Sequence, residues 1–531
     1  MRITNKIMQR NNLSNINTNK IYQDKLSTQM STQKKVSRPS DDPVVAIRAL
    51  RLRSSVTEIT QYYSKNIPDA ESWLEVTEDA LKNLEQIMRN MIEQCTKGSN
   101  GELEIKDRQI ILEQLKALSD EVYSTGDADY AGRYVFTGYR TDLSLSFPEA
   151  TTKEYTITEQ LDRESISSLT KVETGDLLNW TEANFNKTSA QGGVKDNTDE
   201  QKIDAYEVYR IRLAYNDCSK GMAPTLTRMD TAGNEVPITY EDPDNPGTDI
   251  TVTTTVMSSA NDPYKAIHED ANKNKVIFVP ETGELLLGQN VYDAMMKIRD
   301  DPTTVKDEGE IRITYQKENW AKGDLRPEHY FYCKSVTDAE GELEYNKAFL
   351  DGTAEKQAIE YDVGFNQTIR VNSTADECFK PGIGREADDL VSAMEQVMEL
   401  EKIQAKMECL KETASGEDAK TLQTQLDAMG KALTYAKDRC QKLFEHGITT
   451  FQNYLDGANL CITNCGTRSK KLELIENRMQ SQKTTFETLK SENEDVDITE
   501  VAIQLNSAEL TYEAALMATG KVMQSTLLNF I

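Results

Sequence analysis

Apolar residues recur in alternating steps of four and three over two long stretches of the chain. The N-terminal stretch contains Val45, Ala49, Leu52, Val56, Ile59, Tyr63, Ala70, Trp73, Ala80, Leu84, Ile87 and Met91. This spacing keeps an apolar seam on one side of a helix and predicts coiled-coil packing. Pro68 lies inside the stretch and should kink the helix or split it in two, because its ring clashes with the preceding turn.

A second helix should follow the polar loop 97–101, place Ile111, Leu115 and Val122 on its seam, and end at Gly126. The four–three spacing returns after Gly384 and continues to the end of the chain. The last helix should start near Asp497 and run into an apolar tail. Because a chain end normally frays in water, this tail is expected to pack against a partner.

The stretch 142–382 has a different pattern, with short alternating runs bounded by Pro, Gly-Asn and Asp-Gly turns. Such runs predict β-strands. We therefore predict an α+β fold, in which both chain ends form an elongated α-helical coiled-coil bundle and a mostly β outer domain is inserted between them. The predicted parts are an N-terminal arm (1–40), two halves of the bundle (41–140 and 385–496), the insert (141–384) and a C-terminal assembly helix (497–531).

The start of the bundle has a clear polar signal in Ser40, Asp41, Asp42 and Pro43. Ser40 is predicted to cap the helix, with Asp41 and Asp42 at the positive end of the helix dipole. The arm before it is basic, since residues 1–53 hold 11 Lys or Arg against 3 Asp or Glu. It is also rich in Asn, Gln, Ser and Thr, so we expect it to be disordered until assembly.

Composition and motifs argue against several functional classes. The net charge of −27 disfavours nucleic-acid binding. No apolar run approaches a bilayer span, and the N-terminus lacks the apolar core of a cleaved signal peptide. His268, His329 and His446 are the only histidines; the first two are expected on the surface and the third at a helix end. No catalytic motif is present, and no cofactor is expected.

Metal sites are also disfavoured. Cys461 and Cys465 would share a helix face, but no further ligands are spaced for zinc, so a plain thiol pair is the preferred interpretation. The oxygen-rich segment 242–249 lacks the closing Glu of a calcium loop.

Three segments resemble the flagellin superfamily, and within it the hook-associated proteins of the hook–filament junction. The first is STQKKVSRPSDDP at residues 31–43, in which Gln33 stands where the family usually has Gly. The second is the motif GRYVFTGY, with Gly132, Arg133, Tyr134, Phe136, Gly138 and Tyr139. The third is the terminal helix at 497–530.

This resemblance implies a structural, non-enzymatic protein, exported by the flagellar type III apparatus with a chaperone and without a cleaved signal peptide. It implies an extracellular location at the hook–filament junction of the bacterial flagellum. The implied partners are identical subunits in a ring, the hook-side hook-associated protein and flagellin. The residues expected at the assembly interface are Ile3, Ile7, Leu13, Ile16, Leu505, Tyr512, Leu516, Leu527 and Phe530.

Two alternatives stay open at this point. A filament flagellin would share the terminal helices, although GRYVFTGY disfavours it. An extracellular enzyme or an adhesion module could instead be carried by residues 142–382. A cleft with convergent carboxylates would favour the enzyme, and sugar or surface binding by the insert would favour the adhesion module.

Overall fold

The computed structural model describes residues 5–229, 235–241, 246–257, 262–297, 310–337, 341–350 and 357–528. The chain forms two compact units, each built from separated stretches of sequence. The first unit comprises Met1–Glu71, Tyr361–Ile369 and Ser469–Ile531, and the second comprises Ser72–Glu360 and Arg370–Arg468. The predicted division into five parts, which is defined by assembly as much as by folding, stays a prediction.

Long helices carry both ends of the chain. They are α1 (Asn5–Thr32), α2 (Pro43–Gln61), α3 (Ile67–Gly98), α4 (Ile105–Gly126), α9 (Gly382–Thr413), α10 (Glu417–Glu494) and α11 (Ile498–Leu528), with shorter α5 (Pro263–His268), α6 (Gln289–Met295), α7 (Lys347–Leu350) and α8 (Ala375–Cys378) between them. Helix α1 packs against α11, and α4 packs against α9. Pairing of helices from opposite ends of the sequence around a β-rich middle confirms the predicted α+β class.

The helix predicted to kink or split at Pro68 changes its helical type just before that residue. Helices α2 and α3 are joined without a gap by a π-helical turn, Tyr62–Asn66. Within it the backbone N–H of Ile67 bonds to the carbonyl of Tyr62, five residues back. Because proline has no N–H to donate, the wider turn accommodates Pro68 with one extra residue, and the helical path continues.

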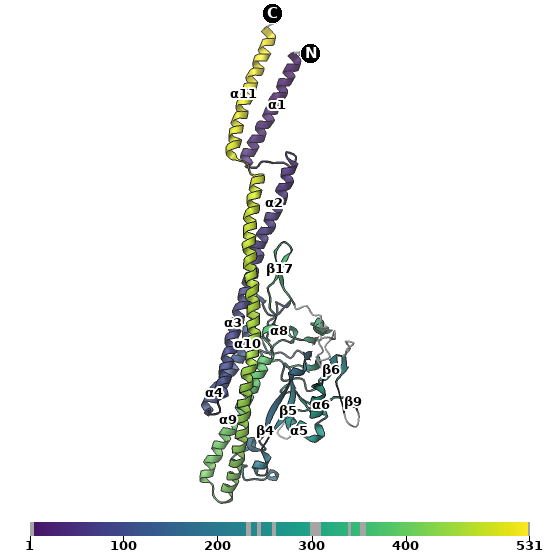
Figure 1. Cartoon of the computed structure of the whole chain (residues 1–531), viewed down its shortest axis with the longest axis vertical. Helices are drawn as coiled ribbons and strands as arrows, with labels where there is room; N and C mark the ends of the chain where they lie inside the picture. The colour runs from purple at the N-terminus through teal and green to yellow at the C-terminus, as the bar shows by residue number, and fades with distance from the viewer. Residues whose placement is uncertain are drawn as a thin grey trace. The chain divides into compact units, whose positions relative to one another are not determined.

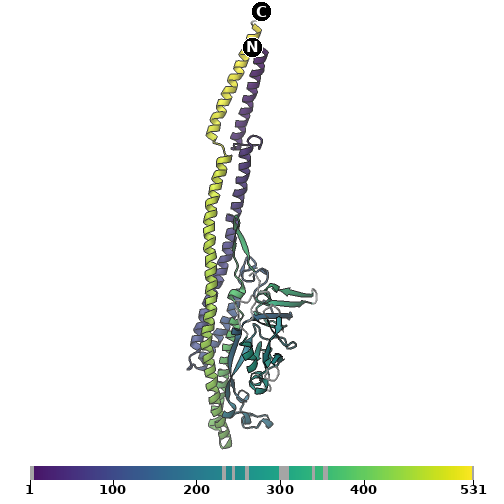
Figure 2. The ribbon, with the colours of Figure 1, turned by 45° about the vertical axis from the view of Figure 1, so that its right-hand side comes forward.

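In the first unit, α1 and α11 run antiparallel, with the start of α1 beside the end of α11 in both views (Figure 1 and Figure 2). The two-stranded hairpin β16 (Glu360–Gly364) and β17 (Gln367–Arg370) contributes its tip to the same unit. Its Gly364 lies close to Met479 on α10. No Cβ is present there, so the hairpin backbone approaches the helix closely.

In the second unit, the apolar seams of α3, α4, α9 and α10 are buried almost completely. The largest buried side chains of these helices include Trp73, Leu74, Leu81, Phe444 and Phe451. At the end of α3, a Cβ on Gly98 would lie 2.3 Å from the Phe444 ring, so only glycine fits this contact.

Two antiparallel-rich sheets form the β part of the second unit. Its six-stranded sheet has the order β15-β14-β3-β13-β6-β7, and its five-stranded sheet has the order β10-β11-β12-β5-β4, in which only β10 and β11 pair in parallel. Small pairs join β1 with β2 and β8 with β9. The remaining strand bounds are β1 (Asp129–Tyr130), β2 (Arg133–Tyr134), β3 (Tyr155–Leu161), β4 (Ile166–Glu173), β5 (Asp204–Arg212), β6 (Thr225–Met229), β7 (Glu235–Pro237), β8 (Thr239–Glu241), β9 (Pro246–Asp249), β10 (Thr251–Thr254), β11 (Lys275–Val279), β12 (Glu284–Leu287), β13 (Ile311–Lys317), β14 (Tyr332–Thr337) and β15 (Gly341–Tyr345).

The short helix α5 packs on the five-stranded sheet (Figure 1). Its Tyr264 and Ile267 join Leu169, Val208 and Leu286 in one apolar cluster. The alternating pattern of these strands places every second side chain on this face, as the sequence predicts for a half-buried strand.

Candidate assembly interface

Among the α1 and α11 side chains that the structure describes, those that are buried lie near the base of the pair, where the two helices meet their connecting loops. Leu26, Val501 and Ala508 form a small buried cluster, against which Leu505 packs partly buried. Two weak side-chain bonds cross the pair, from Tyr22 to Gln504 at 3.4 Å and from Gln23 to Glu509 at 3.5 Å. A two-helix contact of this size leaves most of each helix surface uncovered.

Beyond this base, large apolar side chains face outward. On α11, Ile503, Leu510 and Met517 are 65%, 68% and 67% exposed. They are seven residues apart and therefore lie on one face of the helix. We call these three residues the outer stripe. On α1, Ile7, Leu13 and Ile21 are also exposed. A helix that is apolar on two faces is typical of one that packs against more than one partner.

The predicted interface residues divide into three groups. Ile7, Leu13 and Leu516 are exposed, while Ile16, Leu505 and Tyr512 are half-buried. Leu527 belongs to α11, but its side chain is not among those described, and Ile3 and Phe530 lie outside the described residues. The structure adds the outer stripe, which the sequence analysis missed because it followed a single seam per helix. A second seven-residue repeat at 503, 510 and 517 was the signal that could have found it.

The loops that follow α1 and α10 are tied to each other. Lys34 and Asp495 form an isolated β-bridge, and their side chains pair at 2.5 Å. The backbone adds bonds from Lys35 N–H to the Glu494 carbonyl at 2.7 Å and from Val496 N–H to the Gln33 carbonyl at 3.1 Å. Gln33 has a φ of 58°. Gln33 therefore adopts the left-handed conformation of a tight turn, although this conformation is costly for a residue with a side chain.

A second tie joins α2 to the end of α10. The Arg53 guanidinium holds both carboxylate oxygens of Glu494, at 2.6 and 2.7 Å. This bidentate hydrogen bond lowers the pKa of Glu494 below its usual value. Burial acts in the opposite direction, and the charges of Arg53 and Lys34 add to the lowering. The turns at residues 33–42 and 495–497 are thus fixed to the helices on either side of them within the first unit.

The predicted cap of α2 is corrected at one residue. The N-cap is Asp42, whose side chain accepts from the N–H groups of Val44 and Val45 at 3.0 and 3.1 Å. Ser40 is two residues too early to reach them. Asp41 instead accepts from the Arg38 N–H in the preceding turn, and Pro43 occupies the first helical position as predicted.

The motif at residues 132–139 starts in a tight hairpin of the second unit. Gly132 has a φ of +77° between β1 and β2, a conformation that suits glycine. Arg133 stacks over the ring of Trp73 at 4.9 Å, and Tyr134 donates its backbone N–H to Thr141. Phe136 is buried edge-on against Phe379. These contacts fasten the chain to α3 and to the segment that follows α8.

Parts of this chain are similar to known proteins. Residues 3–141 match the family described as the bacterial flagellin N-terminal helical region. The chain is also 30% identical over 167 residues to flagellar hook-associated protein 3 of Salmonella typhimurium, covering 30% of this chain and 52% of that protein.

The protein of the same name from Escherichia coli is 30% identical over 145 residues, which cover 27% of this chain and 45% of that protein. The chain thus spans about half the length of the curated relatives it matches. Among solved structures, flagellar hook-associated protein-3 from Legionella pneumophila has a TM-score of 0.27 at 10% identity, covering 82% of this chain and 96% of that one. The family match and the two curated relatives confirm the predicted resemblance.

The second half of the motif holds the returning end of the β insert. Gly138 has a φ of +62°, and a Cβ there would lie 2.2 Å from Oε1 of Gln357. The same oxygen accepts the Tyr139 N–H at 3.0 Å, and the Gln357 carbonyl accepts from Asn372 at 2.7 Å. The side chain of Tyr139 itself is exposed. Glycine is thus required where the two ends of the insert meet.

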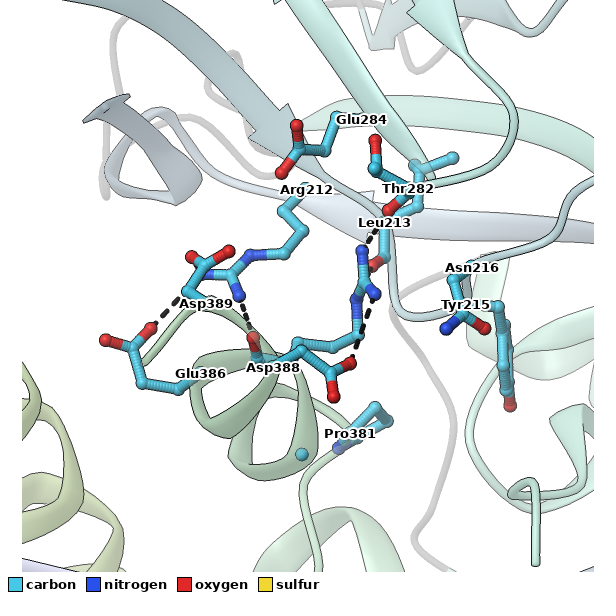
Figure 3. Close-up of polar contacts among 12 residues, drawn as sticks. Arg212, Leu213, Tyr215, Asn216, Thr282, Glu284, Pro381, Glu386, Asp388 and Asp389 are labelled. Carbon is cyan, nitrogen blue, oxygen red and sulfur yellow. Dashed lines mark hydrogen bonds and ion pairs between the residues drawn. The ribbon is translucent and has the colours of Figure 1, made fainter. Parts of the chain in front are cut away.

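A buried ion network joins the five-stranded sheet to α9 (Figure 3). Arg210 pairs with Glu284 and Asp389, and Arg212 pairs with Asp389 at 2.8 Å and with Glu386 at 3.1 Å. Burial alone would raise the pKa of Asp389, but the charges of Arg210 and Arg212 outweigh it and lower the pKa to about 2. These buried ion pairs hold the five-stranded sheet against α9.

A cavity of about 690 Å³ opens beside this network and is lined by Tyr215, Asn216, Pro381 and Asp388, among others (Figure 3). Arg385 also lines it, but its guanidinium donates to the carbonyls of Thr282 and Leu213 and pairs with Asp388 at 3.5 Å. The Arg385 guanidinium is therefore engaged by groups of the protein itself and is not available to bind a substrate.

The histidines differ from the predictions in two cases. His446 lies inside α10 and does not end a helix. His329 is 8% exposed and therefore not a surface residue; its Nε2 lies 3.1 Å from the Ser144 carbonyl. Burial lowers the pKa of His329 to about 4, so the ring is neutral at physiological pH. His268 ends α5 and stacks on Tyr206.

The described residues contain no group of three or more His, Cys, Asp or Glu side chains arranged to hold a metal ion. Half of the oxygen-rich segment 242–249, residues 242–245, lies outside the described residues. Within the described part of the chain, no helix combines the length and apolar content of a membrane span.

Proposed function

We propose that this protein is a structural component of the bacterial flagellum that joins the hook-side hook-associated protein to the flagellin filament. Its terminal helices complete a coiled coil with neighbouring subunits, and the protein performs no catalysis. The observation that carries this proposal is the α1–α11 pair, which leaves apolar side chains uncovered on both helices. Helix α1 also lies in the part of the chain that matches the flagellin N-terminal helical region. The similarity to proteins named flagellar hook-associated protein 3 supports the location at the junction.

The exposed apolar area supports an assembly role energetically. Full burial of a Leu, Ile or Met side chain contributes about 1.5–3 kcal/mol. Six exposed residues, Ile7, Leu13, Ile503, Leu510, Leu516 and Met517, can therefore contribute on the order of 5–10 kcal/mol per subunit when neighbours cover them. Association costs are of similar size, so one neighbour gives weak binding and several neighbours give a stable ring.

The proposed partners follow from this geometry and from the relatives. Identical subunits contact one another around a ring, the hook-associated protein on the hook side lies below, and flagellin lies above. The basic, polar composition of the first 40 residues supports passage in an unfolded state through the type III export apparatus, with a chaperone covering the assembly helices before export.

A filament flagellin is the alternative within the same class. It shares the N-terminal helical region, so the family match does not separate the two. The similarity to hook-associated proteins favours the junction. An enzyme or an adhesion module in the insert has less support, because the arginines and carboxylates beside the cavity at Arg385 bind one another and the backbone.

The proposal is tested by immunogold labelling of isolated flagella. A single band between hook and filament supports a junction protein. Label along the whole filament would favour flagellin instead, and the absence of label from the appendage would exclude both.

The interface itself is tested by charge substitution. Leu13→Asp and Leu510→Asp should leave the monomer folded and abolish incorporation into flagella, because each puts a charge on a face that neighbours must cover. Ile110→Asp on α4, at a residue of similar exposure in the second unit, is the matched control and should still assemble. Deleting residues 524–531 should likewise prevent assembly while the β insert stays folded. Normal assembly of Leu510→Asp would contradict the proposed interface.

A further inference from the structure

Two cysteines far apart in sequence meet where the β insert returns to the helices. Cys378 is the last residue of α8, and Cys461 lies in α10 within the second unit. The Cys461 thiol points at the turn that contains Cys378, with its sulfur 3.7 Å from the carbonyl oxygen of Glu377. The two thiols are also in direct hydrogen-bonding contact. The sequence suggested Cys465 as the neighbour of Cys461, but the structure gives it Cys378.

The surroundings of Cys378 and Cys461 favour the protonated thiol form over the thiolate. Cys378 and Cys461 are 4% and 6% exposed. The hydrogen bond to Cys461, burial, and the charges of Glu377 and Asp376 all raise the pKa of Cys378, so it stays protonated at neutral pH. The described residues offer no third side chain that would complete a metal site around the pair.

The short helix α8 is itself well anchored. The Ala375 N–H bonds to the Phe136 carbonyl at 3.0 Å, and Tyr330 donates to the Phe379 carbonyl at 2.8 Å. On the α10 side, Arg468 donates to the Asn372 carbonyl at 2.8 Å. Hydrogen bonds therefore anchor the backbone on both sides of the place where the two cysteines meet.

We propose that Cys378 and Cys461 form a disulfide in the folded protein when it meets a low-molecular-weight disulfide such as oxidised glutathione. When local opening exposes the pair at mildly alkaline pH, one cysteine loses its proton and, as the thiolate, attacks the small disulfide, breaks its S–S bond and releases one small thiol. The other cysteine then attacks the mixed disulfide and releases the second small thiol. The two cysteines lose two protons and two electrons, and the small disulfide becomes two thiols.

The bond would staple the returning end of the insert to α10 and close a loop of more than 80 residues. A cross-link across a long loop restricts the unfolded chain and stabilises the folded one. Before folding, the same chain carries only separate thiols, which place no constraint on an extended polypeptide. This inference concerns one folded chain, so it stands or falls independently of the proposed junction role.

The test uses the full-length chain, reduced and then exposed to oxidised glutathione at mildly alkaline pH. Free thiols are alkylated, and the peptides are identified by mass spectrometry without reduction. We expect a Cys378–Cys461 linked peptide as the main internal disulfide, whereas the exposed Cys409 takes only a mixed disulfide with glutathione. The thermal unfolding midpoint should rise on oxidation and fall again on addition of dithiothreitol.

Single substitutions assign the effect. Cys378→Ser and Cys461→Ser should each abolish the reversible thermal shift, with Cys378→Val as a second variant if serine disturbs the buried site. Cys465→Ser is the matched control, because Cys465 is buried one turn further along α10 and its thiol bonds to the Leu74 carbonyl. It should retain the shift. Oxidation of Cys409 without any Cys378–Cys461 peptide, or a Cys461–Cys465 link in its place, would overturn the inference.

Discussion

The α1–α11 pair of the first unit and the helices of the second unit share one sequence pattern but differ in burial. In the second unit, seam residues such as Leu84, Leu115, Leu390 and Leu433 are buried by other helices of the same chain. In the α1–α11 pair only Leu26, Val501 and Ala508 reach that state, although the four–three spacing is equally regular. The pattern specifies that a seam is to be covered, and the number of helices available within the chain decides whether it is.

This difference gives the two regions different roles. A seam covered within the chain adds to the stability of the monomer. A seam left open, such as the outer stripe at Ile503, Leu510 and Met517, leaves apolar area exposed in the monomer. In the proposed function this area adds stability only when a neighbouring copy covers it. The contrast also predicts that substitutions of equal size will act on different measurements in the two regions.

The largest expected effect is in the second unit. Phe444→Ala should lower the free energy of unfolding by about 3–5 kcal/mol, because it removes a fully buried ring beside Gly98 and leaves a cavity. Leu13→Ala should change it by less than about 0.5 kcal/mol, because the side chain is exposed. Urea denaturation of the two variants measures both values, and a similar loss in each would remove the distinction between the regions.

A second prediction concerns pH. Glu159 is buried in the six-stranded sheet, and burial raises its pKa to about 7, despite hydrogen bonds from Tyr315 and from the Ala214 N–H. The folded state therefore keeps a proton that the unfolded state loses near pH 4.3. Stability falls as the pH rises from about 4 to 7 and then levels off.

Glu159→Gln keeps an oxygen for both donors and has no charge to bury. We expect it to be more stable than the parent by on the order of 2–3 kcal/mol at pH 8 and nearly equal at pH 4. Thermal unfolding across this range measures the effect. A variant that is less stable than the parent at pH 8 would show that Glu159 is ionised without penalty.

The third prediction weakens the tie at the base of the terminal pair. Arg53→Ala removes the partner of Glu494 and should destabilise the connection between α2 and the end of α10 by about 1 kcal/mol. The effect is small because Arg53 is itself half-exposed. Because the pKa of Glu494 is lowered, the tie contributes above about pH 4 and is lost as the pH falls through that lowered value.

Proteolysis within residues 33–42 should become about fivefold faster in Arg53→Ala, the factor that corresponds to about 1 kcal/mol. Arg89→Ala, which breaks a surface pair with Glu85 in the second unit, is the control and should not change this rate. Equal acceleration in both variants would point to general destabilisation.

The smallest effect is expected at Gln33, which has a φ of 58°. Gln33→Gly relieves a left-handed conformation but increases the freedom of the unfolded chain, so the two effects largely offset each other. We expect a stabilisation between 0 and about 1 kcal/mol, seen as slower proteolysis at the same turn. Faster cleavage would mean that the Gln33 side chain contributes a contact of its own.

Much of the fold could be predicted because its signals are local. The four–three spacing predicts the long helices. Gly126 ends α4, and Gly416 lies in the break between α9 and α10. Asp497 accepts from the Thr499 N–H at the start of α11. The alternating runs at Ile311 and Val276 are strands.

Other features depend on which residues meet in space. Both Ser40 and Asp42 are residue types that can cap a helix. Which of them caps α2 depends on where the first unbonded N–H groups of the helix lie. The π-helical turn before Pro68 depends on the continuity of two packed helices. The contact of Cys378 with Cys461, and the buried place of His329, arise because the insert folds back on α10 and on the Ser144 loop. The spacing of residues along a single sequence does not show which distant residues come into contact.

The central claim is that the terminal helices are completed by neighbouring copies. Hydrogen–deuterium exchange of the free chain and of the same chain in isolated flagella tests it directly. We predict fast exchange along the outer parts of α1 and α11 in the free chain, strong protection of both in the flagellum, and unchanged protection of α9 and the second-unit part of α10. Equal protection of α1 and α11 in the two states would contradict the claim.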